Sequence, residues 1–342
     1  MVDIVESNID AMHRRLAESR MNCRPHIKVH RVPELAQMQV SAGAVGIACQ
    51  TLDEVDSMVA AGFREILLTN SLVDTKKLSR LSELMRYSSI AVTADSNEAI
   101  ETLAQVAAGS GQSASVYVEC DIGDRRTGFA DPYLAAELAI TISRSPSLEF
   151  AGLAAYRGGN PKCSDIDSAE VLLAEVVSRL DHAGLEVPVV SVGGTVFAQR
   201  AWPDCPADTV TEARPGNYAF YDATKVAYGL VSYEDCALRV VSTVISRPGP
   251  TRVVLDAGWH ILSNNPTPAD STYGHILDYP QARITGLYTE HALVELSEAS
   301  ELPRIGDQVT IIPNSCDGVL ASVDMLYGIR SGEIDRAWHL KG

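Results

Sequence analysis

The chain has 342 residues, 46% hydrophobic and 21% charged, which is enough for about two soluble domains. Its formal net charge of -16 is expected to repel nucleic acid and anionic membranes, and no stretch is apolar for long enough to span a bilayer. The seven cysteines include no Cys-x-x-Cys pair, and residues 1–20 carry charges throughout, so we expect a cytoplasmic protein without a signal peptide, a disulfide framework or a structural zinc finger.

Residues 25–230 alternate short apolar runs with helical patterns. The first predicted strand ends near Lys28, within the basic segment 24–30. Further strands are predicted over 45–49, 65–69, 90–92, 115–119, 150–154 and 187–192, and helices over 97–108, 168–183 and from a Thr51 cap to Gly62. Strands that are apolar on both faces and separated by helices indicate parallel βαβ units. At least six such units favour a closed (β/α)8 barrel of the TIM type over an open sheet.

After residue 232 the pattern changes to β-branched runs separated by Gly/Pro turns, without helical spacing. Strands are predicted over 238–246, 251–256, 292–296 and 307–312. This pattern is typical of a small antiparallel β domain. We therefore predict a barrel over 1–232 and a β-rich domain over 233–342, with residues 1–20 able to pack on the second domain.

Polar clusters follow several predicted barrel strands, where loops build the active site of such a fold. They lie at 121–129, 156–159, 191–195 and 214–218. Lys28 also ends a strand, between two arginines and two histidines, and a lysine amid cations is a good amine for binding an aldehyde. The alternative is a basic surface loop.

Two of these clusters could form a phosphate cup. In Gly193-Gly194-Thr195 the glycines let backbone N–H groups converge on an anion, and Gly216 with Asn217 would add a second amide pair. Each could also be a plain tight turn. A lysine for an aldehyde, a phosphate cup and an arginine to face a ring together suggest pyridoxal phosphate (PLP).

The order of these motifs resembles the D-threonine aldolase and D-serine dehydratase family, which are fold-type III PLP enzymes with the alanine racemase barrel. The resemblance covers nearly the whole chain. It implies that Lys28 forms the Schiff base, that Arg126 lies near the cofactor ring, and that Tyr156 lies on the cofactor side. It assigns the phosphate to Gly193, Gly194, Thr195, Gly216 and Asn217. Alternatively, Tyr156 is a core residue, and Arg126 pairs with Asp121 or Asp124.

Two positions depart from this family. It carries a divalent metal at a Pro-x-His-x-Cys or Pro-x-His-x-Asp motif, which corresponds here to 313–317. Asp317 matches one ligand, but Ser315 replaces the histidine, and a hydroxyl is a poor substitute for imidazole. Whether a metal binds is therefore open. Arg157 stands where the family has histidine; it cannot act as a base, and either clamps a substrate carboxylate or phosphate or faces solvent.

The resemblance implies a homodimer acting on a small amino acid. Our first hypothesis is a lyase that cleaves a D-β-hydroxy amino acid to glycine and an aldehyde, with a base near Ser315 and Asp317. The second is a metal-free racemase or epimerase, in which Lys28 and one of Cys316, Asp317 or His291 act on opposite cofactor faces. The third is a non-catalytic PLP-binding protein.

Overall fold

The computed structural model describes residues 1–200, 208–267, 270–296 and 303–340. They form two compact units, one from Asp10–Gly216 and the other from Met1–Ile9 with Asn217–Gly342. The division falls before the predicted boundary at 232, because residues after 216 bond within the second unit. The Ala223 N–H donates to Pro313 O at 3.0 Å, for example. Their helical pattern had made them resemble barrel sequence.

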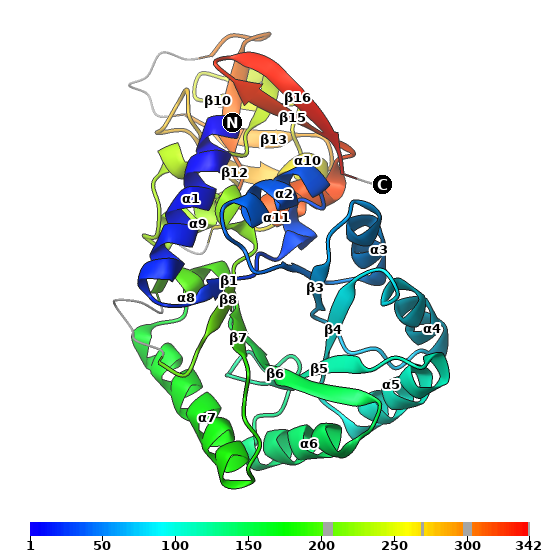
Figure 1. Cartoon of the computed structure of the whole chain (residues 1–342). Helices are drawn as coiled ribbons and strands as arrows, with labels where there is room; N and C mark the ends of the chain where they lie inside the picture. Colours follow the sequence, from blue (N-terminus) through cyan, green and yellow to red (C-terminus); the bar gives the residue numbers. More distant parts are fainter. Residues whose placement is uncertain (201–207, 268–269, 297–302, 341–342) are drawn as a thin grey trace. The chain divides into compact units, whose positions relative to one another are not determined.

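A parallel eight-stranded sheet forms the first unit, in the order β1-β8-β7-β6-β5-β4-β3-β2. Its end strands are joined by a parallel bridge between His26 and Ala48, and the strands surround a closed ring in Figure 1. The predicted (β/α)8 barrel is therefore confirmed. The strands are β1 (Asn22–Cys23), β2 (Ile47–Cys49), β3 (Glu65–Leu68), β4 (Ser89–Ala94), β5 (Ala114–Cys120), β6 (Leu148–Tyr156), β7 (Val190–Gly193) and β8 (Glu212–Arg214).

Helices lie outside this ring, and side-chain caps fix where several of them begin (Figure 1). The Thr51 hydroxyl accepts the Glu54 N–H at 3.2 Å, as the sequence predicted for this cap. The helices are α1 (Val2–Glu18), α2 (Pro33–Ser41), α3 (Leu52–Ala60), α4 (Thr75–Leu84), α5 (Asn97–Ser110), α6 (Pro132–Arg144), α7 (Cys163–His182) and α8 (Thr195–Arg200). Of these, α1 begins in the second unit and ends in the first.

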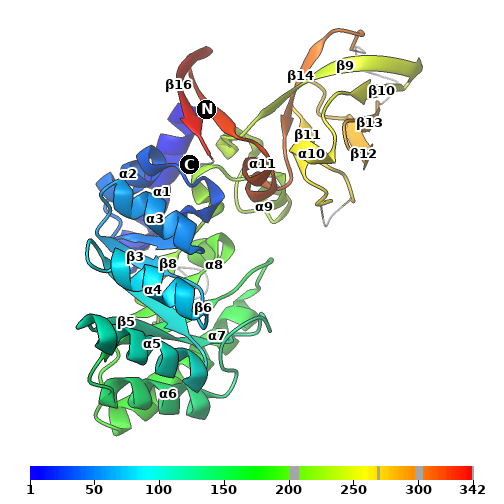
Figure 2. The same cartoon turned by 90° about the vertical axis from the view of Figure 1, so that its right-hand side faces the viewer.

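The second unit is built on a six-stranded antiparallel sheet in the order β11-β14-β9-β10-β13-β12, with a separate hairpin β15–β16 (Figure 2). The strands are β9 (Val240–Gly249), β10 (Arg252–Leu255), β11 (His275–Ile276), β12 (Arg283–Leu287), β13 (Ala292–Glu295), β14 (Gln308–Ile312), β15 (Met325–Arg330) and β16 (Glu333–His339). Short helices that the sequence pattern did not predict also occur here: α9 (Ala223–Ala227), α10 (Trp259–Leu262) and α11 (Cys316–Ser322).

The helices and the cysteines bear on two further predictions from the sequence. Among the described residues no helix is both long and apolar enough to cross a bilayer. Cys163 is disulfide-bonded, although the spacing of the cysteines had predicted no disulfide framework. Among the residues that the structure describes, five other cysteines are free and buried: Cys23, Cys49, Cys120, Cys236 and Cys316.

Candidate active site

Lys28 lies in a short 3-10 turn, η1 (Ile27–Val29), and not at the end of a strand as predicted, because β1 already ends at Cys23. Ile27 and Val29 are buried, with 0% and 3% of their surface exposed, so the turn is fixed from both sides of the lysine. The Lys28 N–H donates to His26 Nδ1 at 3.4 Å, and the Lys28 side chain is half-buried. The turn therefore presents a single amine from an anchored backbone.

His26 is a buried residue of this site that the sequence analysis did not select. Its Nε2 lies 2.9 Å from Thr69 Oγ1. Burial, and then the positive charges of Lys28 and Arg214, hold the pKa of His26 well below 6.5, and Arg126 acts in the same direction. Three cations thus lie close enough to act on one imidazole. Its position two residues before the lysine was the only sequence signal.

Three strands end side by side with candidate residues. Tyr156 ends β6 and pairs with Gly193, which ends β7 and pairs in turn with Arg214 at the end of β8. A Cβ on Gly193 would lie 2.9 Å from Tyr156 Cδ2, so a larger residue there would require the tyrosine ring to shift. The Arg126 guanidinium lies over the Tyr156 ring, 4.3 Å from its centroid.

The predicted phosphate turn is built by close backbone approach. Gly194 has φ +119°, and a Cβ there would lie 2.4 Å from Arg157 O. The next residue, Thr195, begins α8, whose first N–H groups lack partners within the helix. Thr195 Oγ1 accepts the Gly216 N–H at 3.1 Å, which links the two predicted phosphate turns; their contact with a phosphate stays a prediction. Asn217 follows directly and begins η2 (Asn217–Ala219) of the second unit.

Arg214 is a second residue that the sequence analysis named only as part of a loop. Its guanidinium donates to Ser191 O and Ala155 O, both at 2.8 Å. Burial lowers the pKa of Arg214, and the charge of Glu212 opposes this effect. Across the residues that the structure describes, no hydrogen-bond partner is found for its buried Nε. A bound polar group could satisfy that donor.

Arg157 is engaged by two carboxylates. Its guanidinium lies 3.5 Å from Asp124 and 3.4 Å from Asp165, and 21% of its side chain is exposed. The Arg157 side chain therefore does not simply point into solvent, and both of its terminal nitrogens already lie next to a carboxylate. Arg126 forms no ion pair with Asp121 or Asp124 in the described structure, and its contact with Tyr156 takes the place of that alternative.

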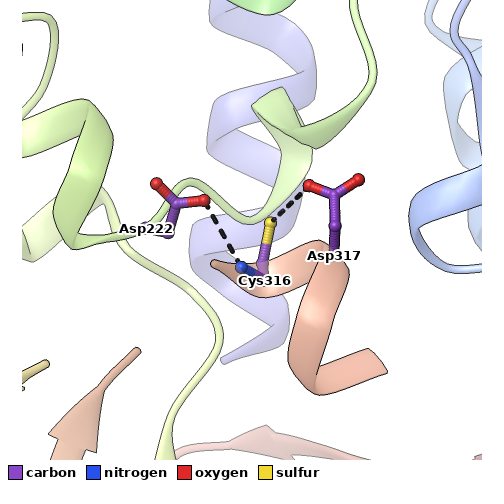
Figure 3. Close-up of side chains that lie close together, drawn as sticks. All are labelled: Asp222, Cys316 and Asp317. Carbon is purple, nitrogen blue, oxygen red and sulfur yellow. Dashed lines mark hydrogen bonds between the residues drawn. The ribbon is translucent and has the colours of Figure 1, made fainter. Parts of the chain in front are cut away.

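Three potential metal ligands meet in the second unit, as Figure 3 shows. Asp222 caps α9, while Cys316 and Asp317 begin α11, and one ligand atom from each lies within 4.8 Å of the others. Asp222 was not selected from the sequence; it meets the cysteine across 94 residues of chain. His291 does not belong to this group. It lies exposed at the turn between β12 and β13.

These residues do not fit the divalent metal that the resemblance implies. Ser315 Oγ accepts the Gly318 N–H at 3.2 Å as the cap of α11. Burial raises the pKa of the Cys316 thiol well above 9.0, so in the metal-free protein the thiol keeps a proton that a metal would have to displace. Asp222 is paired with the Lys225 ammonium at 3.1 Å. Of the two ligand positions in the family motif, only that of Asp317 still holds a residue type that the family uses.

The barrel residues do fit PLP. The glycines at 193 and 194 let the chain turn closely at the ends of the strands, the buried Arg214 Nε offers a donor, and Lys28 supplies an amine. Lys28, Arg126 and Arg214 also bring positive charge toward an anionic ligand in a chain of net charge -16.

Comparisons with known proteins agree with this geometry. Residues 2–224 match the family model of the alanine racemase N-terminal domain, and 237–329 match that of a serine dehydratase domain. A D-threonine aldolase from Arthrobacter sp is 30% identical to this chain, covering 98% of this chain and 89% of its own. The crystal structure of D-threonine aldolase from Filomicrobium marinum gives a TM-score of 0.89 at 29% identity, covering 99% of this chain and 92% of that one.

A dehydratase is also similar. D-threo-3-hydroxyaspartate dehydratase from Delftia sp. HT23 gives a TM-score of 0.90 at 26% identity, covering 99% of this chain and 95% of that one. A mutant of a D-threo-3-hydroxyaspartate dehydratase has been solved in a metal-free form. The chain thus belongs to the D-threonine aldolase and D-serine dehydratase family of PLP-dependent enzymes, which has the alanine racemase fold.

Proposed function

We propose that this chain is a PLP-dependent lyase that cleaves a D-configured β-hydroxy amino acid, by a retro-aldol reaction, to glycine and an aldehyde. The observation that carries the proposal is the set of residues at the ends of the barrel strands. Tyr156, Gly193 and Arg214 end three paired strands, and Lys28 lies in an anchored turn after a fourth. The similarity to an aldolase over 98% of the chain supports the choice of reaction.

The barrel residues would hold the cofactor. Bound PLP supplies an electron sink for the negative charge that develops at Cα when a bond to it breaks. Lys28 Nζ is the amine that would hold the aldehyde, and the turn at Gly194 and Thr195 would hold the phosphate. Arg126 and Tyr156 would lie on the same side of the cofactor ring, because the Arg126 guanidinium already stacks on that tyrosine.

The proposed reaction needs a base that removes the proton of the substrate's β-hydroxyl group. We take Asp317 as the base that removes the proton from the β-hydroxyl, since Ser315 is occupied as a helix cap. Cys316 is less suited, because burial keeps its thiol protonated. Arg157 is held by Asp124 and Asp165, so a direct contact with substrate would require it to leave one of them; that contact stays a prediction.

Product analysis separates this proposal from its rivals. Holoenzyme mixed with D-threonine or D-phenylserine should release an aldehyde and glycine. A 2-oxo acid with ammonia would instead indicate a dehydratase. Deuterium uptake at Cα without either product would indicate a racemase or epimerase. An unchanged cofactor absorbance with every β-hydroxy amino acid would indicate a non-catalytic PLP-binding protein.

A variant tests the cofactor attachment. Borohydride reduction of holoenzyme should attach the cofactor to the peptide that contains Lys28, as located by mass spectrometry. Lys28→Ala should abolish this attachment, while Lys76→Ala, at an exposed lysine, should leave it unchanged. Attachment at another lysine in the native protein would overturn the assignment.

A further inference from the structure

A lysine ammonium lies in the cluster where the family resemblance implies a divalent cation. Lys225 Nζ donates to Asp222 Oδ1 at 3.1 Å and to Oδ2 at 3.3 Å. The pair is shielded from water, with 12% of the Lys225 side chain and 1% of that of Asp222 exposed. This is a buried ion pair inside a set of potential metal ligands.

The acceptor capacity of Asp222 is filled by this arrangement. Oδ1 accepts the Lys225 backbone N–H at 3.1 Å as well as its ammonium. Oδ2 accepts the ammonium and also the Cys316 N–H at 3.3 Å. Each carboxylate oxygen has about two lone-pair sites, so no site is left for a metal unless one of these donors moves away.

The other members of the cluster are also engaged as donors or acceptors. The Cys316 thiol donates to Asp317 Oδ2 at 3.8 Å, and Asn217 Nδ2 donates to the same oxygen at 3.4 Å (Figure 3 shows the thiol contact). Ser315, in the place of the family histidine, accepts the Gly318 N–H. The cluster is therefore internally bonded around one ammonium, and a divalent ion would have to break several of these bonds.

We propose that the Lys225 ammonium is the resident cation of the Asp222, Cys316 and Asp317 cluster and excludes a divalent metal from it. Two carboxylates and one ammonium leave a local charge of about −1, whereas a divalent ion beside the ammonium would be repelled by it. In this interpretation Lys225 and Ser315 act together: Lys225 supplies a fixed positive charge, and Ser315 stands where the family has its histidine ligand.

Metal binding by the native holoenzyme tests this directly, without any turnover. The holoenzyme is incubated with Zn²⁺ or Mn²⁺, dialysed, and analysed for bound metal by mass spectrometry and calorimetry. Wild type and Lys225→Arg, which keeps the cation, should hold far less than one ion per chain. Lys225→Ala frees the Asp222 oxygens and should gain one Zn²⁺ per chain, with an affinity at least about tenfold tighter than wild type.

Two further variants identify the ligands and the control. In Lys225→Ala loaded with Co²⁺, a thiolate-to-cobalt absorption band should appear, and Cys316→Ser should remove it. Adding Ser315→His to Lys225→Ala should tighten Zn²⁺ binding further. The matched control, Lys76→Ala at an exposed lysine, should behave as wild type.

The proposal is overturned if wild type binds one divalent ion per chain, or if folded Lys225→Ala gains none. Should Lys225→Ala not fold, metal titration of wild type and Lys225→Arg decides alone: uptake by either contradicts the proposal, and none in both supports it. Because the readout is bound metal, a failure here is distinct from failure of the proposed aldol cleavage, which is judged from products.

Discussion

His26 and His30 lie on either side of Lys28, and burial keeps both of them uncharged. His30 Nδ1 accepts the Val32 N–H at 3.0 Å, and its Nε2 lies 3.4 Å from Gln39 Oε1. Burial lowers the pKa of His30 from 6.5 to about 4. In the sequence these histidines had looked like part of a cationic surrounding for the lysine. In the structure both histidines are buried, neutral hydrogen-bonding groups.

The neutral state of His30 predicts a loss of stability in acid. Between pH 6.5 and about pH 4, His30 is protonated in the unfolded chain but not in the folded chain. The free energy of unfolding therefore falls as the pH falls through that window. The loss from this residue is about 3 kcal/mol when complete. Urea unfolding at several pH values should show a flatter pH dependence for His30→Gln than for wild type. Equal slopes would contradict the assignment.

Asp317 can be tested as the proposed base by an isosteric change. Asp317→Asn keeps an acceptor oxygen for the Asn217 amide but cannot accept a proton from substrate. We expect kcat for aldehyde release to fall by about 10²- to 10⁴-fold, with the cofactor absorbance unchanged. Ser315→Asn, which preserves a helix-capping oxygen, is the control and should lose far less activity. A kcat for Asp317→Asn within a few-fold of wild type would exclude this role.

At the scale of elements, the turn between β7 and α8 depends on Gly194. A methyl group there would lie 2.4 Å from the Arg157 carbonyl oxygen, and φ is +119°. Gly194→Ala should therefore cost at least about 3 kcal/mol and weaken PLP binding by the apoenzyme. Gly184→Ala is the matched control, because its φ is +74° with no atom within 4 Å of the added group, and it should cost only about 1 kcal/mol. Similar losses would show that the close approach is unimportant.

Strands and helices differed in how well the sequence indicated them. Strands that are apolar on both faces were found closely: the predicted 65–69 is Glu65–Leu68 in the structure. The two-residue β1 is too short to give a pattern of its own. The helix α4 buries only Leu78, Leu81 and Leu84 in a polar segment, a spacing that the analysis passed over.

The candidate site shows the same limit. Lys28, Tyr156 and Gly193 were predicted because motif order placed them after strands. Asp222 and Lys225 were not, since their meaning comes from contact with Cys316, far along the chain. Burial works against the charged ammonium, but attraction to Asp222 and its neighbours outweighs this and raises the pKa of Lys225. No local pattern reveals such a long-range balance.

At the scale of the whole molecule, the N-terminal segment belongs with the C-terminal unit. Met1–Ile9 joins Asn217–Gly342, and the Met1 amino group donates to Ala237 O at 2.9 Å. Two kinds of contact hold the segment. Asn8, with 6% of its surface exposed, donates to the backbone oxygens of two residues, while Arg330, with 37% of its side chain exposed, forms ion pairs with Asp3 and Glu6.

Burial decides which contact matters more. Asn8→Ala leaves the carbonyl oxygens of Ala219 and Asp235 without their donor and should cost about 2 kcal/mol. Arg330→Ala removes more charge, but its ion pairs are screened by solvent, so we expect a cost below about 1 kcal/mol. The thermal midpoint of Asn8→Ala should therefore lie below that of Arg330→Ala. Added salt should reduce the difference in thermal midpoint between Arg330→Ala and wild type, and should leave the difference between Asn8→Ala and wild type unchanged. If Arg330→Ala were the less stable variant, the segment would be held by surface charge and not by its buried amide.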